Sequence, residues 1–129
     1  MKRVLLVDYE KNNLVRLSNL FRDKYKIDPS IFTGRLSSLY EFILHDEDGV
    51  IFIRIDNASV NGLEISRKAG IWYPRIQVVW MSDSESNALD AFAQGIDSYL
   101  VLPANWEKLQ QIVQSLQYKK KRYDRRQYV

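Results

Sequence analysis

The sequence contains no cysteine and only one histidine, His45. The first absence excludes disulfide bonds, thiolate metal sites and thiol nucleophiles, and the second excludes a metal site built from several histidines. No apolar run reaches the length that crosses a membrane. The opening residues, Met-Lys-Arg-Val-Leu-Leu-Val-Asp, contain too short an apolar stretch for a signal peptide. We therefore expect a cytoplasmic protein without a membrane partner.

The formal net charge of +3 is distributed unevenly along the 129 residues. Residues 118–129 contain six Lys or Arg and one Asp, whereas residues 1–117 contain 13 basic and 15 acidic residues. A basic run of this kind is typical of a solvated helix end or a linker, and it also suits nucleic acid or an acidic partner. The length fits a single domain. We predict one domain over residues 1–117 and a basic tail over residues 118–129.

Five apolar runs alternate with five helix-type patterns. The predicted strands cover residues 4–7, 26–33, 50–55, 76–81 and 97–102. Pro29 places the second strand at a sheet edge, because proline has no N–H to donate. The predicted helices begin after Asn12 or Asn13, after Gly34, near Gly62, after Ser82-Asp83-Ser84 and after Asn105. This alternation predicts an α/β fold, with a parallel sheet covered by helices on both faces.

Several polar residues lie at the carboxyl ends of the predicted strands. Ligands bind at these ends in sheets of this kind. The central strand, Val50 to Ile55, is apolar apart from Arg54, as expected of a strand buried on both faces. A guanidinium in this place either binds an anion or neutralises a carboxylate. The candidate site gathers Asp8, Tyr9, Glu10, Arg54, Asp56, Ser82, Asp83, Leu102 and Pro103.

Four segments together resemble the receiver domain of bacterial two-component response regulators, over residues 1 to about 117. They are Val-Leu-Leu-Val-Asp-Tyr-Glu at 4–10, Asn-Gly-Leu-Glu at 61–64, Val-Val-Trp-Met-Ser at 78–82, and Ala-Gln-Gly-Ile-Asp-Ser-Tyr-Leu-Val-Leu-Pro at 93–103. The resemblance implies a doubly wound, flavodoxin-like sheet of strand order 2-1-3-4-5 with five helices. It also implies a non-enzymatic regulatory domain in signal transduction, often within a transcriptional regulator.

The resemblance further implies a site in which an acidic pair and a phosphorylatable aspartate hold Mg²⁺, while a lysine and a hydroxyl bind the phosphoryl group. In this chain the phospho-acceptor position falls on Arg54, the lysine position on Leu102, and the second acid of the pair is Tyr9. Ser82 keeps the hydroxyl, and Tyr99 matches the aromatic residue that moves in switching. We therefore predict a pseudo-receiver whose pocket is closed to phosphorylation.

An ion pair between Arg54 and Asp8 is predicted to occupy the place of the metal. We expect no cofactor; if Mg²⁺ binds at all, its ligands would be Asp8, Glu10 and Asp56. In the alternative interpretation, Asp56 is a non-standard phospho-acceptor that uses this Mg²⁺; otherwise it caps the turn that follows. Tyr9 is expected to fill the gap over the pocket. Glu10 either keeps one metal ligand or favours the first turn of the next helix.

Residues 85–117 are the predicted contact surface, since members of the family commonly dimerise or bind protein partners through the corresponding elements. Ser82 and Tyr99 form either a fixed pair or a two-state pair. The basic tail is expected to lead to an output module, DNA-binding in kind, that lies beyond this chain. A third interpretation is a small nucleic-acid binder that uses the tail. The interface candidates are Glu85, Asn87, Asp90, Gln94, Tyr99, Lys108 and Gln111.

Overall fold

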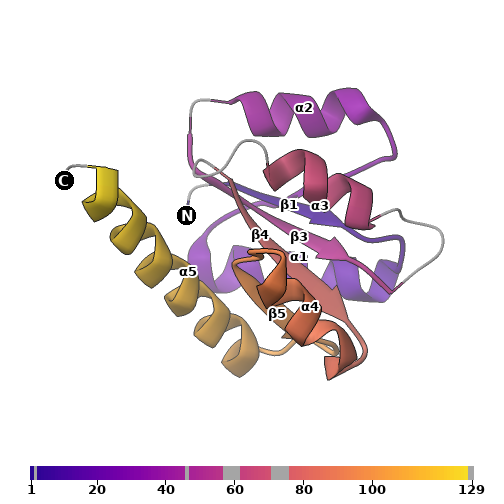
Figure 1. Cartoon of the computed structure of the whole chain (residues 1–129). Helices are drawn as coiled ribbons and strands as arrows, with labels where there is room; N and C mark the ends of the chain where they lie inside the picture. The colour runs from indigo at the N-terminus through magenta and orange to yellow at the C-terminus, as the bar shows by residue number, and fades with distance from the viewer. Residues whose placement is uncertain (2, 46, 57–61, 71–75, 128–129) are drawn as a thin grey trace.

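The computed structural model describes residues 1–127 except residues 2, 46, 57–61 and 71–75; the side chains of residues 36, 68–70 and 120–127 also lie outside the description. Asn61, quoted in the family resemblance, is thus not described. Within the described ranges, five strands alternate with five α-helices (Figure 1). None of the helices in these ranges combines the length and the apolar character needed to cross a lipid bilayer.

The strands form one parallel sheet of order β2-β1-β3-β4-β5, which confirms the predicted fold class. β2 contains only two residues and lies at the sheet edge, next to Pro29, as the missing N–H of that proline predicts. The strands are β1 (Arg3–Val7), β2 (Ser30–Ile31), β3 (Gly49–Arg54), β4 (Ile76–Ser82) and β5 (Ser98–Val101).

Helices cover both faces of this sheet. α2 and α3 lie on one face together with α4, and α1 and α5 lie on the other (Figure 1). The helices are α1 (Lys11–Tyr25), α2 (Leu36–Leu44), α3 (Gly62–Gly70), α4 (Ala88–Ala93) and α5 (Trp106–Gln127), and a short 3₁₀ helix, η1 (Glu85–Asn87), precedes α4.

Two apolar layers hold the helices to the sheet, because successive side chains of a strand point to opposite faces. Leu6 and Phe52 point toward α1 and α5, where the ring of Phe21 meets that of Phe52 edge-on with centroids 5.4 Å apart. Leu5 and Ile51, one position earlier in their strands, point toward α2, α3 and α4. Each such fully buried side chain contributes about 1.5–3 kcal/mol relative to exposure. Because each face of the sheet packs against one of these apolar layers, the central strands have no polar face.

The ends of several elements differ from the predictions. The N-cap of α1 is Glu10, so the prediction of Asn12 or Asn13 was wrong; Asn13 lies in the first turn, with its side chain buried. β5 is shorter than predicted and begins after Asp97, which accepts a hydrogen bond from the Val78 N–H at 2.8 Å. The predicted cap of the last helix is confirmed, because Asn105 Oδ1 accepts from the backbone N–H three residues later at 2.9 Å.

Helix α5 runs through most of the predicted tail. It is helical from Trp106 to Gln127, and its 22 residues correspond to about 33 Å of helix. Its C-terminal part projects beyond the sheet (Figure 1). Residues 118–127 therefore continue a helix of the domain, while the boundary proposed near residue 117 stays a prediction.

Candidate functional site

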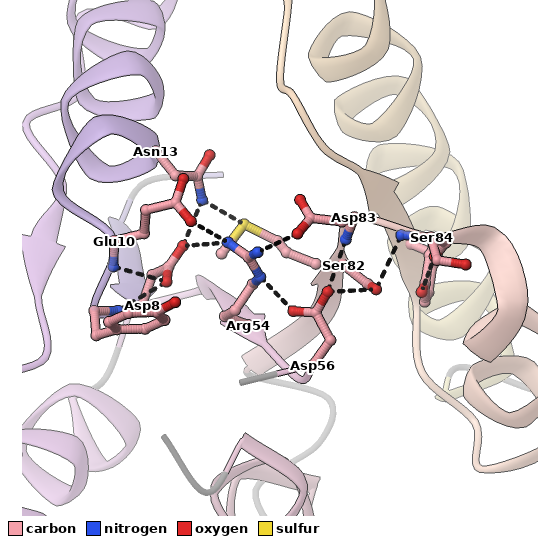
Figure 2. Close-up of polar contacts among 11 residues, drawn as sticks. Asp8, Glu10, Asn13, Arg54, Asp56, Ser82, Asp83 and Ser84 are labelled. Atoms are coloured by element: carbon pink, nitrogen blue, oxygen red, sulfur yellow. Dashed lines mark hydrogen bonds and ion pairs between the residues drawn. The ribbon is translucent and has the colours of Figure 1, made fainter. Parts of the chain in front are cut away.

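The candidate site lies at the carboxyl edge of the sheet, where β1, β3 and β4 end side by side. Val7 is opposite Ile53 and Arg54 is opposite Met81, so the residues that follow β1 and β4 come close to the end of β3. Arg54 is the last residue of β3 and only 3% exposed. Figure 2 shows its side chain between the residues that follow β1 and those that follow β3 and β4.

The Arg54 guanidinium contacts four carboxylates. Its Nη1 lies 3.3 Å from Asp8 Oδ2 and 3.5 Å from Glu10 Oε2, and its Nη2 lies 2.9 Å from Asp83 Oδ2. Its Nε donates to Asp56 Oδ1. Burial alone lowers the pKa of Arg54, but the hydrogen bond to Asp56 and the charges of Asp8, Asp56 and Asp83 outweigh it and raise this pKa. The guanidinium therefore remains a fixed cation.

Asp8 is the fully buried member of this cluster. Its Oδ1 accepts the backbone N–H groups of Tyr9 at 2.8 Å and Glu10 at 3.1 Å. Its Oδ2 accepts from Asn13 Nδ2 at 2.7 Å as well as from Arg54. The Arg54–Asp8 contact expected from the sequence is thus present, within a larger network than a single ion pair. Both oxygens of Asp8 are occupied by protein donors.

Asp56 joins the end of β3 to the end of β4. Its Oδ2 accepts from Ser82 Oγ and from the Asp83 N–H, both at 2.9 Å. Burial raises the pKa of Asp56, yet the hydrogen bonds from Asp83 N–H, Arg54 and Ser82 and the charge of Arg54 together lower it. The turn that Asp56 was expected to cap, residues 57–61, lies outside the described residues. Its described partners place Asp56 inside the cluster, with both oxygens hydrogen bonded.

The remaining predicted pocket residues contribute less. Tyr9 is 50% exposed and reaches Asp8 through its backbone N–H, so the expectation that it fills the pocket is not supported. Glu10 is half exposed at the N-cap of α1. Leu102 is buried in the apolar layer of α1 and α5, and its N–H donates to the Ser82 carbonyl at 2.8 Å. The position expected to hold a lysine therefore supplies no charge.

Ser82 and Tyr99 are linked through Ser84. The Ser84 N–H donates to Ser82 Oγ at 3.2 Å, and the Tyr99 hydroxyl donates to the Ser84 carbonyl at 2.6 Å. Ser82 is buried and Tyr99 is half-buried. Both residues of the predicted switch thus belong to one chain of hydrogen bonds that begins at Asp56.

Sequence reasoning missed three members of the network. The sequence places Asp83 at the end of its strand but does not predict its pairing with Arg54, and it indicates Ser84 only as part of a helix cap. The sequence suggests Asn13 as an N-cap, whereas in the structure it lies five residues after Asp8 and donates to that carboxylate. An asparagine on the buried face of the first helix was the available signal, because a buried amide needs a hydrogen-bond partner.

The predicted contact surface is partly exposed as expected. Glu85, Asp90, Gln94 and Gln111 are exposed. Asn87 and Lys108 were also expected to be exposed, but both are half-buried. The Lys108 Nζ donates to the carbonyls of Val101 at 3.0 Å and Pro103 at 3.1 Å, which holds it against the end of β5. The same surface also exposes two large apolar side chains of α4, Leu89 at 84% and Phe92 at 56%.

The residues of the site do not fit the Mg²⁺ that a receiver-type pocket implies. Mg²⁺ requires oxygen ligands in octahedral geometry and keeps several waters. Here a guanidinium lies among the carboxylates, adds repulsion toward a cation, and already binds the oxygens of Asp8 and Asp56. Across the described part of the chain, no group of three or more Asp, Glu or His side chains is arranged to hold a metal ion.

Comparisons with known proteins give a fold but no family. No protein-family model matches the chain, and no curated protein matches it. Among solved structures, a two-component response regulator from Clostridium difficile is 22% identical with a TM-score of 0.71, over 92% of this chain and 97% of that chain. A structure described as adenylate cyclase from Rhodopirellula baltica is 17% identical with a TM-score of 0.73, over 98% and 96%.

A third structure is the receiver domain of a sensor histidine kinase from Pseudomonas aeruginosa, with a magnesium ion coordinated in its active-site cleft. It is 14% identical with a TM-score of 0.69, over 88% of this chain and 94% of that chain. At these identities the likeness concerns the fold alone. The chain therefore has the fold of response-regulator receiver domains, with an arginine at the centre of its site.

Proposed function

We propose that this chain is a signalling regulatory domain of the response-regulator type that works without phosphorylation, through contacts with other proteins. The observation that carries the proposal is the buried Arg54 guanidinium among the carboxylates of Asp8, Glu10, Asp56 and Asp83. The Arg54 guanidinium, which is part of the protein, neutralises the negative charge of these carboxylates in place of a metal ion. The domain is a regulatory module rather than an enzyme.

Asp56 is poorly arranged as a substitute phospho-acceptor. An attacking carboxylate oxygen has to be free and in line with the phosphoryl donor. Both oxygens of Asp56 accept hydrogen bonds, from Arg54 and from Ser82 and the Asp83 N–H. Leu102 provides no positive charge for a phosphoryl group. These contacts favour a site that does not transfer phosphoryl groups.

Incubation with a small phosphodonor and Mg²⁺, followed by intact-mass measurement, tests the proposal. We expect no mass gain of one phosphoryl group in the natural chain. The double variant Arg54→Asp, Leu102→Lys is expected to gain this mass in a Mg²⁺-dependent manner, because it restores an acceptor and a phosphate-binding cation. The Leu102→Lys single variant is the control and should stay unmodified. Phosphorylation of the natural chain at Asp56 would contradict the proposal and support the alternative.

The proposed output surface comprises α4, β5 and α5. Leu89 and Phe92 expose apolar surface on α4, with the exposed acids Glu85 and Asp90 nearby in the chain. Exposed apolar side chains rimmed by polar residues are typical of protein contact sites. We propose that a protein partner or a second copy of this chain binds here. The continuation of α5 to Gln127 would lead to an output module, for which DNA binding in transcription regulation is our proposal.

A further inference from the structure

Three hydrogen bonds, joined through the backbone of Ser84, connect the carboxylate of Asp56 to the side chain of Tyr99. Asp56 Oδ2 accepts from Ser82 Oγ at 2.9 Å, and Ser82 Oγ in turn accepts from the Ser84 N–H at 3.2 Å. The Ser84 carbonyl accepts from the Tyr99 hydroxyl at 2.6 Å. These hydrogen bonds run from the end of β3, through the loop after β4, to β5. Figure 2 shows the part from Arg54 to Ser84.

The loop after β4 is fastened to Asp56 at two points. Besides the Ser82 hydroxyl, the Asp83 N–H donates to Asp56 Oδ2 at 2.9 Å. The Ser84 side chain then accepts from the Ser86 N–H at 3.1 Å and begins η1, which leads directly into α4. The arrangement of this loop, and the start of the helix it leads to, therefore depend on one carboxylate.

Arg54 keeps that carboxylate in place. Its Nε donates to the second oxygen of Asp56, while its two Nη groups contact Asp8 and Asp83. An ionised carboxylate only accepts hydrogen bonds, and bonds from a guanidinium are about twice as strong as neutral ones. Ser82 is 1% exposed and Arg54 is 3% exposed, so these two donors are shielded from water, whereas the Asp56 side chain that accepts from them is 23% exposed.

We propose that Arg54 and Asp56 form a permanent lock, which holds the loop after β4 and Tyr99 in one arrangement without any phosphoryl group. The proposal deepens the proposed function, on which it rests, since it names what sets the shape of the α4–β5 surface. Asp56 takes the place of an anion delivered by phosphorylation, and Arg54 takes the place of the cations that would bind that anion.

Amide hydrogen exchange on the full chain, without phosphodonor or added metal, tests the lock. In Asp56→Ala we expect the protection factors of the amides of Asp83, Ser84 and Ser86 to fall about tenfold or more. The Asp83 N–H loses its acceptor, and the hydroxyl acceptors of the other two amides lose the carboxylate that fixes the loop. The amide of Leu6, in the middle of β1, reports on global unfolding and should keep its protection. Unchanged protection at all three loop amides in a folded Asp56→Ala variant would overturn the lock.

Asp83→Ala is the matched control. It also removes a carboxylate from Arg54. However, the Asp83 side chain is 72% exposed and takes no part in the hydrogen bonds that lead from Asp56 to Tyr99. The backbone N–H of residue 83, which donates to Asp56, remains. We expect the loop amides to keep their protection within about twofold. A loss as large as that of Asp56→Ala would overturn the proposal, because it would mean that any loss of charge loosens the loop.

Ser82→Ala is a second variant that preserves the ion cluster. It should lower the protection of the Ser84 amide and alter the NMR signals of the Tyr99 ring, while the Asp83 amide remains protected by Asp56. The proposed order of the hydrogen bonds is contradicted if the Ser84 amide keeps its protection. It is also contradicted if the Ser84 and Asp83 amides both lose protection. Phosphorylation of the natural chain in the mass experiment would refute the proposed function, whereas the lock is judged separately by these exchange rates.

Discussion

Arg54 shows how one residue determines the character of the whole site. A receiver-type pocket concentrates carboxylates, and such a group is stable only with cations nearby. Here the cation is covalently part of β3, and its Nε, Nη1 and Nη2 atoms contact the carboxylates of Asp8, Glu10, Asp56 and Asp83. The protein itself therefore supplies a cation to these four carboxylates.

Removal of the Arg54 guanidinium should strongly destabilise the fold. In Arg54→Ala, the fully buried carboxylate of Asp8 loses its ionic partner, and breaking a buried pair in this way costs about 3–5 kcal/mol of the free energy of unfolding. Urea denaturation measures the loss. Mg²⁺ should raise the melting temperature of this variant but not that of the natural chain, because only the variant offers carboxylates without a cation.

Arg22→Ala is the control for this comparison. Arg22 forms an ion pair with Asp28 at 2.8 Å, but the two side chains are 52% and 78% exposed. An exposed pair contributes about 0–1 kcal/mol. Similar losses for Arg22→Ala and Arg54→Ala would show that burial of the cluster has no energetic consequence.

The lowered pKa of Asp56 predicts a pH dependence of stability. A carboxyl group with a folded-state pKa below its unfolded value of about 3.9 stabilises the fold above that value, and this contribution is lost as the pH falls through the folded-state pKa. The difference in free energy of unfolding between the natural chain and Asp56→Asn should be constant from about pH 7 to 5 and shrink below about pH 4. If this difference in the free energy of unfolding does not change with pH, the stabilising role of the ionised Asp56 carboxylate is contradicted.

At the scale of elements, the close approach of α3 to the end of β3 shapes the site. A Cβ on Gly62, at the start of α3, would overlap the Arg54 carbonyl and lie 2.9 Å from Ile53 Cγ2. Only a glycine lets the helix begin this near to the strand. The backbone of Arg54 is therefore confined by the helix as well as by β4.

Gly62→Ala should push α3 away from β3. The overlap involves backbone atoms, which do not move aside easily, so we expect a loss of about 1–3 kcal/mol in the free energy of unfolding. Ser37→Ala, an exposed position in α2, is the control and should change it by less than about 0.5 kcal/mol. A Gly62→Ala variant as stable as the natural chain would contradict the tight junction.

At the scale of the whole molecule, the site around Arg54 and the exposed face of α4 lie on connected parts of the fold. The loop after β4 leads from Ser82 through η1 to α4, where Leu89 and Phe92 expose apolar surface. The Lys119 Nζ lies 5.7 Å from the centre of the Phe92 ring and donates to the Asp97 carbonyl, so α5 contacts this face near the beginning of its extension. The proposed contact surface is thus next to the loop after β4.

Leu89→Asp should weaken self-association if the partner is a second copy of this chain. An apolar side chain that is 84% exposed and central to an interface loses its contacts and adds a charge, so we expect at least about a tenfold rise in the dissociation constant by sedimentation. Val15→Asp, on α1 at the opposite face, is the control and should leave association unchanged. Equal effects of both substitutions, or a natural chain that stays monomeric at high concentration, would refute a homodimer through α4.

The sequence by itself determined the alternation of strands and helices, and with it the parallel α/β class, because apolar periodicity, prolines and glycines act over a few residues. The strand order was implied by the family resemblance, and the strand pairing confirms it. The sequence also placed Arg54 and Asp8 at one sheet edge. The tertiary structure decided the rest of the network. Asp8 and Asp83 lie 46 and 29 residues from Arg54 in the chain, and only the pairing of β1, β3 and β4 brings their carboxylates to the guanidinium. Side-chain hydrogen bonds depend on distances that composition and spacing do not contain.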